Sequence, residues 1–207
     1  MRPTLVLAGL AALASSARAD TVFHSWMVAP EVVQAGDSFT VEVWVSMETT
    51  DFDPNGTLFG WATLSVAFGG DIGLIEQATE AYGSLIAPGL NGDVTSGGIL
   101  DIMPWQPGHP WVWTIDDSNP VLMFRFDVTP ADGRRGILMF DDAPASAYSQ
   151  VHFGWFLDPE TWFEEAVSTL ETPNTHYQAE GVTVRVIPAP ASLGAWAVAG
   201  LAIRRRR

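Results

Sequence analysis

The sequence predicts an all-β protein, an antiparallel β-sandwich with one short helix, placed between an N-terminal signal peptide and a short C-terminal transmembrane helix. Three observations support this fold class. Apolar residues recur with a period of two in several segments, turn-forming residues separate those segments, and the strands do not alternate with long helical patterns. Hydrophobic residues make up 47% of the 207 residues, which is enough apolar material for a packed core.

The clearest strands are the segments in which apolar and polar residues alternate strictly. They are residues 38–47, 122–128 and 182–186. Such alternation is typical of a strand that buries one face and leaves the other in solvent. Weaker patterns predict further strands at 21–28, 60–68, 98–103, 111–115, 136–140 and 148–157.

Short clusters of glycine, asparagine, aspartate and proline lie between these strands. They occupy residues 35–37, 54–56, 69–71, 91–93 and 131–133. Such residues favour tight turns, so they predict frequent chain reversals of the kind a sandwich requires.

One helix is predicted over residues 158–170. Asp158 is a favourable N-cap, Pro159 suits the first helical position, and Glu160 complements the positive end of the helix dipole. An apolar stripe follows at spacings of four and three: Phe163, Val167 and Leu170. A loop with a single helical turn is the alternative, because short isolated helices are marginally stable.

The N-terminal 19 residues predict an export signal. Arg2 gives a positive start, residues 5–14 are apolar, and Ala17 and Ala19 supply small residues for cleavage before Asp20. The apolar run is too short to span a bilayer, which favours a removable signal over an anchor. A frayed apolar terminus is the alternative.

The C-terminal tail, residues 188–207, has three parts. An extended motif comes first, then an uncharged run ending at Ile203, then an arginine cluster. A 13-residue helix over 191–203 would be roughly 20 Å long, which is shorter than the ~30 Å hydrocarbon core. The motif and cluster residues are Ile187, Pro188, Ala189, Pro190, Ala191, Ser192, Arg204, Arg205, Arg206 and Arg207.

This tail resembles a PEP-CTERM sorting signal. The resemblance covers about the last 20 residues and implies export, a transient stay in the inner membrane, and processing by an exosortase, a transpeptidase-like membrane enzyme. Ala189 stands where the family motif has glutamate, which leaves the exosortase subtype open. An ordinary C-terminal tail anchor is the alternative.

The predicted sandwich, residues 20–187, resembles the cohesin-like fold in the order of its strands and turns. The resemblance covers about residues 29–140, and the Tyr-Asp-Pro-like turn common in cohesins is missing after Phe68. A jelly-roll or immunoglobulin-like sandwich explains the same pattern. The matching segments are 35–41, 60–68, 97–100 and 121–128.

The charge of the chain excludes nucleic acid as a partner. Residues 20–187 contain four basic and 24 acidic residues, a formal charge of −20, whereas phosphate neutralisation requires a basic surface. Cysteine is absent, so disulfides and thiolate metal sites are excluded. No cofactor is predicted except calcium, for which Asp51, Asp53 and Asn55 offer oxygen ligands at alternate positions. An EF-hand is ruled out because Ala62 occupies its twelfth position, and a polar turn is the preferred interpretation.

Three tryptophans gather in a loop-rich segment: Trp105, Trp111 and Trp113. Exposed indole rings at these positions would form a platform for a sugar. Packing in the core or at its rim is the preferred interpretation, because buried aromatic side chains are the commoner outcome.

Catalytic motifs are weak. Gly36-Asp37-Ser38 matches the opening of GDSL-type esterases but leads into an alternating strand, and the four histidines show no metal-binding spacing. Adjacent acidic pairs such as Asp141-Asp142 would face opposite sides of a strand, which disfavours joint catalysis.

The sequence therefore predicts a non-enzymatic exported β-sandwich, located at the cell surface or in the extracellular matrix. Its predicted partners are an exosortase and, outside the cell, polysaccharide or surface proteins. A carbohydrate-binding module that uses the segment from Trp105 to Trp113 is the alternative, and a surface hydrolase is a weaker one.

Overall fold

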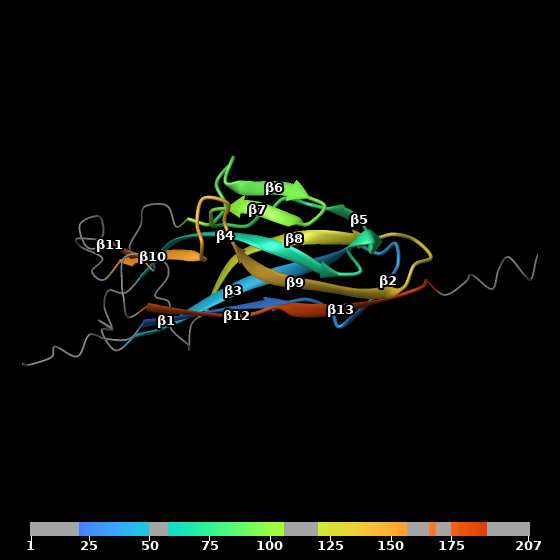
Figure 1. The fold of residues 1–207 in the computed structure, drawn as a ribbon, viewed down its shortest axis with the longest axis horizontal. Helices are drawn as coiled ribbons and strands as arrows, with labels where there is room; N and C mark the ends of the chain where they lie inside the picture. Colours follow the sequence, from blue (N-terminus) through green and yellow to red (C-terminus); the bar gives the residue numbers. More distant parts are fainter. Residues whose placement is uncertain (1–20, 50–57, 106–119, 157–165, 169–174, 190–207) are drawn as a thin grey trace, which may run out of the picture.

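The computed structural model describes residues 21–49, 58–105, 120–156, 166–168 and 175–189, which form two packed β-sheets (Figure 1). The first sheet consists of β1 (Thr21–Val28), β3 (Phe39–Thr49), β5 (Ile75–Ala78), β8 (Val121–Pro130) and β12 (Thr175–Glu180). The second consists of β2 (Val32–Gln34), β4 (Leu58–Gly70), β6 (Asn91–Thr95), β7 (Gly98–Ile102), β9 (Gly136–Pro144), β10 (His152–Phe156), β11 (Ala166–Ser168) and β13 (Val182–Ile187). A 3-10 turn, η1 (Ile72–Leu74), connects β4 to β5.

The five-stranded sheet has the order β12-β1-β3-β8-β5. The eight-stranded sheet runs β11-β10-β4-β9-β13-β2, with β7 also paired to β4 and β6 paired to β7. In Figure 1 the β6–β7 hairpin lies along one long edge of the molecule, and β1, β12 and β13 lie along the other. Most pairs are antiparallel; β1–β12 and β13–β2 are parallel.

Near each end, the chain crosses from the five-stranded sheet to the eight-stranded sheet. The chain leaves the five-stranded sheet after β1 and joins the eight-stranded sheet as β2, and it passes from β12 to β13 in the same way. Gly181 lies at the second crossing, where a Cβ atom would come within 2.5 Å of the carbonyl oxygen of Phe140. Only glycine fits this close approach between two backbones.

The core forms where the inward residues of the two sheets meet. Four phenylalanines form one cluster around Phe140, which has ring centroids of Phe68 at 5.5 Å, Phe126 at 5.7 Å and Phe39 at 6.1 Å. At the opposite end Phe23 stacks on Phe153 at 4.7 Å. Each buried aromatic side chain contributes roughly 1.5–3 kcal/mol to folding by leaving water.

The structure confirms the all-β prediction and most of its strands. The segments predicted from strict alternation correspond to β3, β8 and β13, and the weaker patterns correspond to β1, β4, β7, β9 and β10. Sequence reasoning missed β2, β5, β6 and β12. The strand predicted at 111–115 lies outside the described residues.

The helix prediction is wrong where it can be checked. Ala166–Ser168, inside the predicted helix, is strand β11 and pairs antiparallel with β10. Val167 is β-branched, and pairing with β10 gives this segment backbone hydrogen bonds along one side, which outweighs the marginal stability of a short helix. Residues 157–165 are outside the described part of the chain. No helix among the described residues has the length and apolar character needed to cross a membrane.

Candidate functional site

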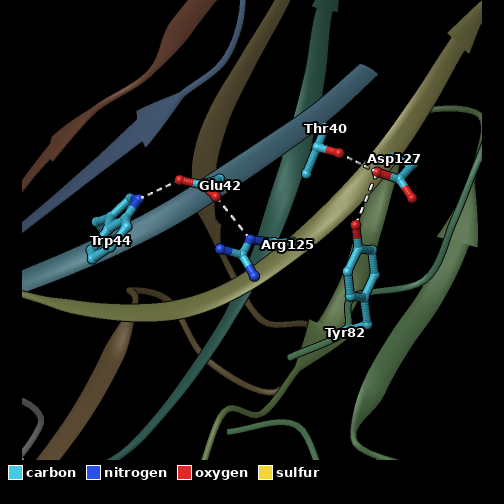
Figure 2. A network of polar contacts seen from close by, with 6 residues as sticks. All are labelled: Thr40, Glu42, Trp44, Tyr82, Arg125 and Asp127. Atoms are coloured by element: carbon cyan, nitrogen blue, oxygen red, sulfur yellow. Dashed lines mark hydrogen bonds and ion pairs between the residues drawn. The ribbon is translucent and has the colours of Figure 1, made fainter. Parts of the chain in front are cut away.

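The outer face of the five-stranded sheet carries a network of polar and aromatic side chains. Figure 2 shows six of its members, drawn from β3, β8 and the segment after β5: Thr40, Glu42, Trp44, Tyr82, Arg125 and Asp127. They form two groups on neighbouring strands.

The first group centres on Glu42. Its carboxylate accepts a hydrogen bond from Arg125 Nε at 2.8 Å with one oxygen and from the Trp44 indole nitrogen at 3.1 Å with the other (Figure 2). These residues are half-buried or exposed, so the ion pair contributes little to stability by itself. Its effect is to hold the indole ring in a fixed orientation.

The second group centres on Asp127. Thr40 donates to its carboxylate at 2.6 Å and the Tyr82 hydroxyl donates to the same oxygen at 3.0 Å (Figure 2). Burial, followed by the hydrogen bond to Asp127, raises the pKa of Tyr82. The backbones of Tyr82 and Arg125 also exchange two hydrogen bonds of 2.8 Å. This antiparallel bridge fixes the segment after β5 against β8.

Two tryptophans lie side by side on this same face. Trp26 on β1 is the cross-strand partner of Trp44 on β3, and Glu180 on β12 is the partner of Trp26 from the other side. His24 occupies the next outward position on β1, between Ser46 and Gln178. The face therefore combines indole rings with amide, carboxylate and imidazole groups.

The outer face of the eight-stranded sheet has a different composition. Ile137 and Met139 of β9 are 48% and 49% exposed, and Val32 of β2 and Ile187 of β13 are 37% and 38% exposed. We call these four residues the apolar strip. Arg185 lies between Ile137 and Val32 in the strand register, and its methylene stem can lie along apolar neighbours.

Acidic residues border the apolar strip. Asp71 accepts a hydrogen bond from the backbone nitrogen of Ile137 at 3.0 Å, Asp141 follows Met139 on the same face, and Glu31 precedes Val32. Arg185 stands within the strip and the exposed Arg134 and Arg135 precede Ile137, so the surface is an apolar centre bordered by charges of both signs.

One carboxylate is buried between the sheets. Asp142 of β9 accepts a hydrogen bond from the Tyr177 hydroxyl of β12. Burial raises the pKa of Asp142, the hydroxyls of Ser25 and Tyr177 oppose the rise, and the charge of Asp141 adds to it. Burial and the charge of Asp142 also raise the pKa of Tyr177.

The structure separates the acidic pair at 141 and 142. Asp141 points to solvent whereas Asp142 points into the interior, as their places on one strand require. The two carboxylates therefore do not share a site. His152 is buried against Trp61 and Tyr148, and no group of three potential metal ligands occurs among the described residues.

Of the three tryptophans considered as an alternative sugar platform, only Trp105 is described. It is 43% exposed, forms an isolated bridge with Trp61, and donates its backbone N–H to Leu85 at 2.7 Å. Trp111 and Trp113 lie outside the described residues, as do Asp51, Asp53 and Asn55. The sugar platform and the calcium site, each the less favoured interpretation of its segment, are therefore not tested.

The predicted processing signals are also mostly outside the described ranges. Ile187 ends β13, Pro188 and Ala189 are exposed beyond it, and the tail from Pro190 onward is not described. The signal residues Ala17, Ala19 and Asp20 precede the first described residue. Cleavage and sorting stay predictions.

Sequence reasoning missed Trp26, Glu42 and Arg125 as members of one surface. The alternation in residues 38–47 already assigns Glu42 and Trp44 to the solvent face. The signal that was absent is the register, because Glu42 and Arg125 are 83 positions apart.

The chain matches no protein-family model and no curated protein. Among solved structures it is similar to a cohesin module from a Clostridium perfringens family 33 glycoside hydrolase, with 11% identity, coverage of 82% of this chain and 99% of that chain, and a TM-score of 0.49. A type II cohesin domain from the cellulosome of Acetivibrio cellulolyticus has 10% identity, coverage of 78% and 95%, and a TM-score of 0.42. The third cohesin of ScaC, in complex with the ScaB dockerin from the same organism, has 12% identity, coverage of 82% and 99%, and a TM-score of 0.37.

Proposed function

We propose that this chain is an exported, non-enzymatic binding module of the bacterial surface or extracellular matrix, and that its tail is processed by an exosortase. The apolar strip is the observation that carries the binding role. Four large apolar side chains stand exposed on one sheet face, bordered by charged side chains. Clustered apolar side chains with a polar rim are typical of protein-binding surfaces.

The charge of the module selects the partner. A formal charge of −20 over residues 20–187 disfavours a second copy of the chain, because two such surfaces repel. The strip is therefore proposed to bind a different protein, one that presents apolar side chains and carries a net positive charge. Complementary charge of this kind accelerates association and makes it sensitive to salt.

Photo-crosslinking on living cells tests the strip. A photoreactive residue at Met139 or Ile137 should give the same protein adduct, which should weaken at high salt. Thr129, on the other sheet, is the matched control and should give none. If the variants reach the cell surface and neither strip position gives an adduct, the protein-binding role of the strip is contradicted.

The tail is proposed to be a sorting signal, on the basis of Pro188, Pro190 and the arginines at 204–207. Deletion of residues 188–192 should leave full-length protein in the inner membrane, while the wild-type chain reaches the surface with a shortened C-terminus. Mass spectrometry of the surface-located wild-type protein decides the matter, since an intact Arg207 contradicts processing.

The exposed ring of Trp105 keeps one alternative open, a carbohydrate-binding loop that includes Trp111 and Trp113. Under that alternative Trp105→Ala should abolish polysaccharide binding while the melting temperature stays within a few degrees. Affinity gel electrophoresis measures the first quantity and circular dichroism the second.

A further inference from the structure

A hollow opens on the five-stranded sheet, on the side away from the apolar strip. Its volume is about 540 Å³. Pockets of roughly 300–1,000 Å³ are the usual size for small-molecule sites. Strands β1, β3 and β12 supply its described lining: His24, Ser25, Trp26, Ser46, Gln178, Ala179 and Glu180.

The strand register arranges five of these residues in two rows, and Trp44 extends the first row beyond the described lining of the hollow. Glu180, Trp26 and Trp44 occupy adjacent positions across β12, β1 and β3, and Gln178, His24 and Ser46 occupy the next row. Each row therefore places groups that hydrogen-bond beside a partly exposed indole or imidazole ring. No residue of the segment from Trp105 to Trp113 is among the described lining.

This combination matches the chemistry of a pyranose ring. A pyranose has an apolar face of C–H groups, which packs on an indole, and a periphery of hydroxyls that both donate and accept hydrogen bonds. A glutamine amide does both and a carboxylate accepts. Gln178 and Glu180 stand on the exposed strand β12, within the same hollow as the Trp26 ring.

The indole next to Trp26 is held in place before any ligand arrives. Trp44 donates its N–H to Glu42, and Glu42 is in turn held by Arg125 (Figure 2). A ring that is already oriented loses less conformational entropy on binding. Trp44 can therefore extend the surface offered to a second sugar unit.

The charges around the hollow decide between sugar classes. Glu180 lines the hollow, and Glu48 Oε2 lies 3.9 Å from His24 Nε2. The nearby Arg125 is already paired with Glu42. Carboxylates at this position repel uronates and sulfated sugars. The ligand expected here is uncharged.

We propose that this hollow is a binding site for an uncharged pyranose polymer, with the sugar ring on Trp26 and its hydroxyls bonded to Gln178 and Glu180. The site is distinct from the proposed protein-binding strip, which lies on the other sheet. The two proposals are therefore independent: evidence against the sugar site does not affect the protein-binding strip, and the reverse also holds.

Affinity gel electrophoresis of the full chain, purified in a mild detergent, tests the proposal. The gels contain a mixed-linkage β-glucan, a galactomannan or dextran as neutral probes, and alginate as the anionic probe. At least one neutral polymer should retard the protein, and alginate should not. Trp26→Ala should weaken binding by about tenfold or more, and Gln178→Ala by roughly threefold to tenfold.

Trp105→Ala is the matched control, because it removes an exposed indole elsewhere and should leave binding unchanged. If Trp26→Ala lowers the melting temperature, its loss of binding could reflect unfolding. Gln178→Ala and Glu180→Gln then test the site, since both side chains are exposed on β12 and contribute little to packing. Three results would each overturn the proposal: no retardation by any neutral polymer, equal retardation by alginate, or loss of binding in Trp105→Ala with Trp26→Ala, Gln178→Ala and Glu180→Gln unaffected.

Discussion

Two neighbouring inward positions on strand β9 have opposite chemistry. Phe140 contacts three other phenylalanine rings, whereas Asp142, two residues further along, places a carboxylate against the hydroxyl of Tyr177. The same strand thus contributes to an apolar end of the interior and to a polar end. The difference shows that one end of the interior is held by aromatic packing, whereas the other combines the stacked rings of Phe23 and Phe153 with a hydrogen bond to a buried carboxyl group.

The polar end lies beneath the hollow on the five-stranded sheet. Ser25 lines that hollow and also influences the pKa of Asp142. Buried polar groups require specific partners, so they restrict the geometry around them more than apolar contacts do. This end of the interior is therefore suited to support a binding surface.

The largest expected effect comes from the apolar end. Phe140→Ala should lower the free energy of unfolding by about 3–5 kcal/mol, because it leaves a cavity among packed rings. Ile137→Ala on the exposed side of the same strand is the control and should change it by less than about 0.5 kcal/mol. Urea denaturation measures both values, and equal losses would remove the distinction between the two sides of β9.

The polar end should respond less strongly. Tyr177→Phe removes the hydroxyl that donates to Asp142 and should cost about 1–3 kcal/mol, the usual effect of leaving a buried acceptor unpaired. The ring itself stays, so packing against Phe153 is retained. Urea denaturation at neutral pH provides the measurement, and a stability equal to that of the wild type would mean that the hydroxyl contact contributes nothing.

The pH dependence of stability sharpens the comparison further. The folded state raises the pKa of Asp142 above its ordinary value of 3.8, so the folded protein binds the proton more tightly than the unfolded chain. Its contribution to stability is present below pH 3.8 and is lost as the pH rises through the folded-state value. Asp142→Asn should therefore lose this part of the pH dependence, and stability measured from pH 3 to 8 should fall less steeply than in the wild type. Asp141→Asn removes the neighbouring charge that adds to the rise, so it should reduce the slope by less than Asp142→Asn does.

The smallest effect is expected at the surface. A double-mutant cycle with Glu42→Gln and Arg125→Gln should give a coupling energy of about 0.2–1 kcal/mol, because both side chains are partly exposed and solvent screens the pair. Half-molar salt should reduce it further. A coupling above about 2 kcal/mol would mean that this pair behaves like the buried contacts of the polar end.

The sequence predicts the long strands well and the short ones poorly. Strands such as β3 and β8 show strict alternation because one face of each is buried. Strands β5, β6 and β12 carry mostly polar, glycine or alanine residues and lie toward sheet edges, so no period of two appears. Their positions follow from pairing with distant segments, which local pattern does not encode.

The candidate binding surfaces are also hard to predict from the sequence, because they combine residues from distant segments. Alternation predicts that Trp44 faces solvent, yet it does not predict that Trp26 is its neighbour or that Gln178 borders the same hollow. Asp142 breaks the expected pattern, because an acidic residue at an inward position looks like a surface residue in the sequence. Such positions become visible only when the sheets are assembled.

The crossing of the terminal strands has a mechanical consequence. Because β1 is parallel to β12, and β12 continues into β13, the described chain begins at Thr21 near one end of the long axis and β13 ends at Ile187 near the other (Figure 1). A pull transmitted between these two points runs along the strands, so the hydrogen bonds of β1 and β13 are loaded in shear and must break together rather than one after another. A module tethered by its tail while its face grips a polymer would resist drag from flowing liquid along this direction.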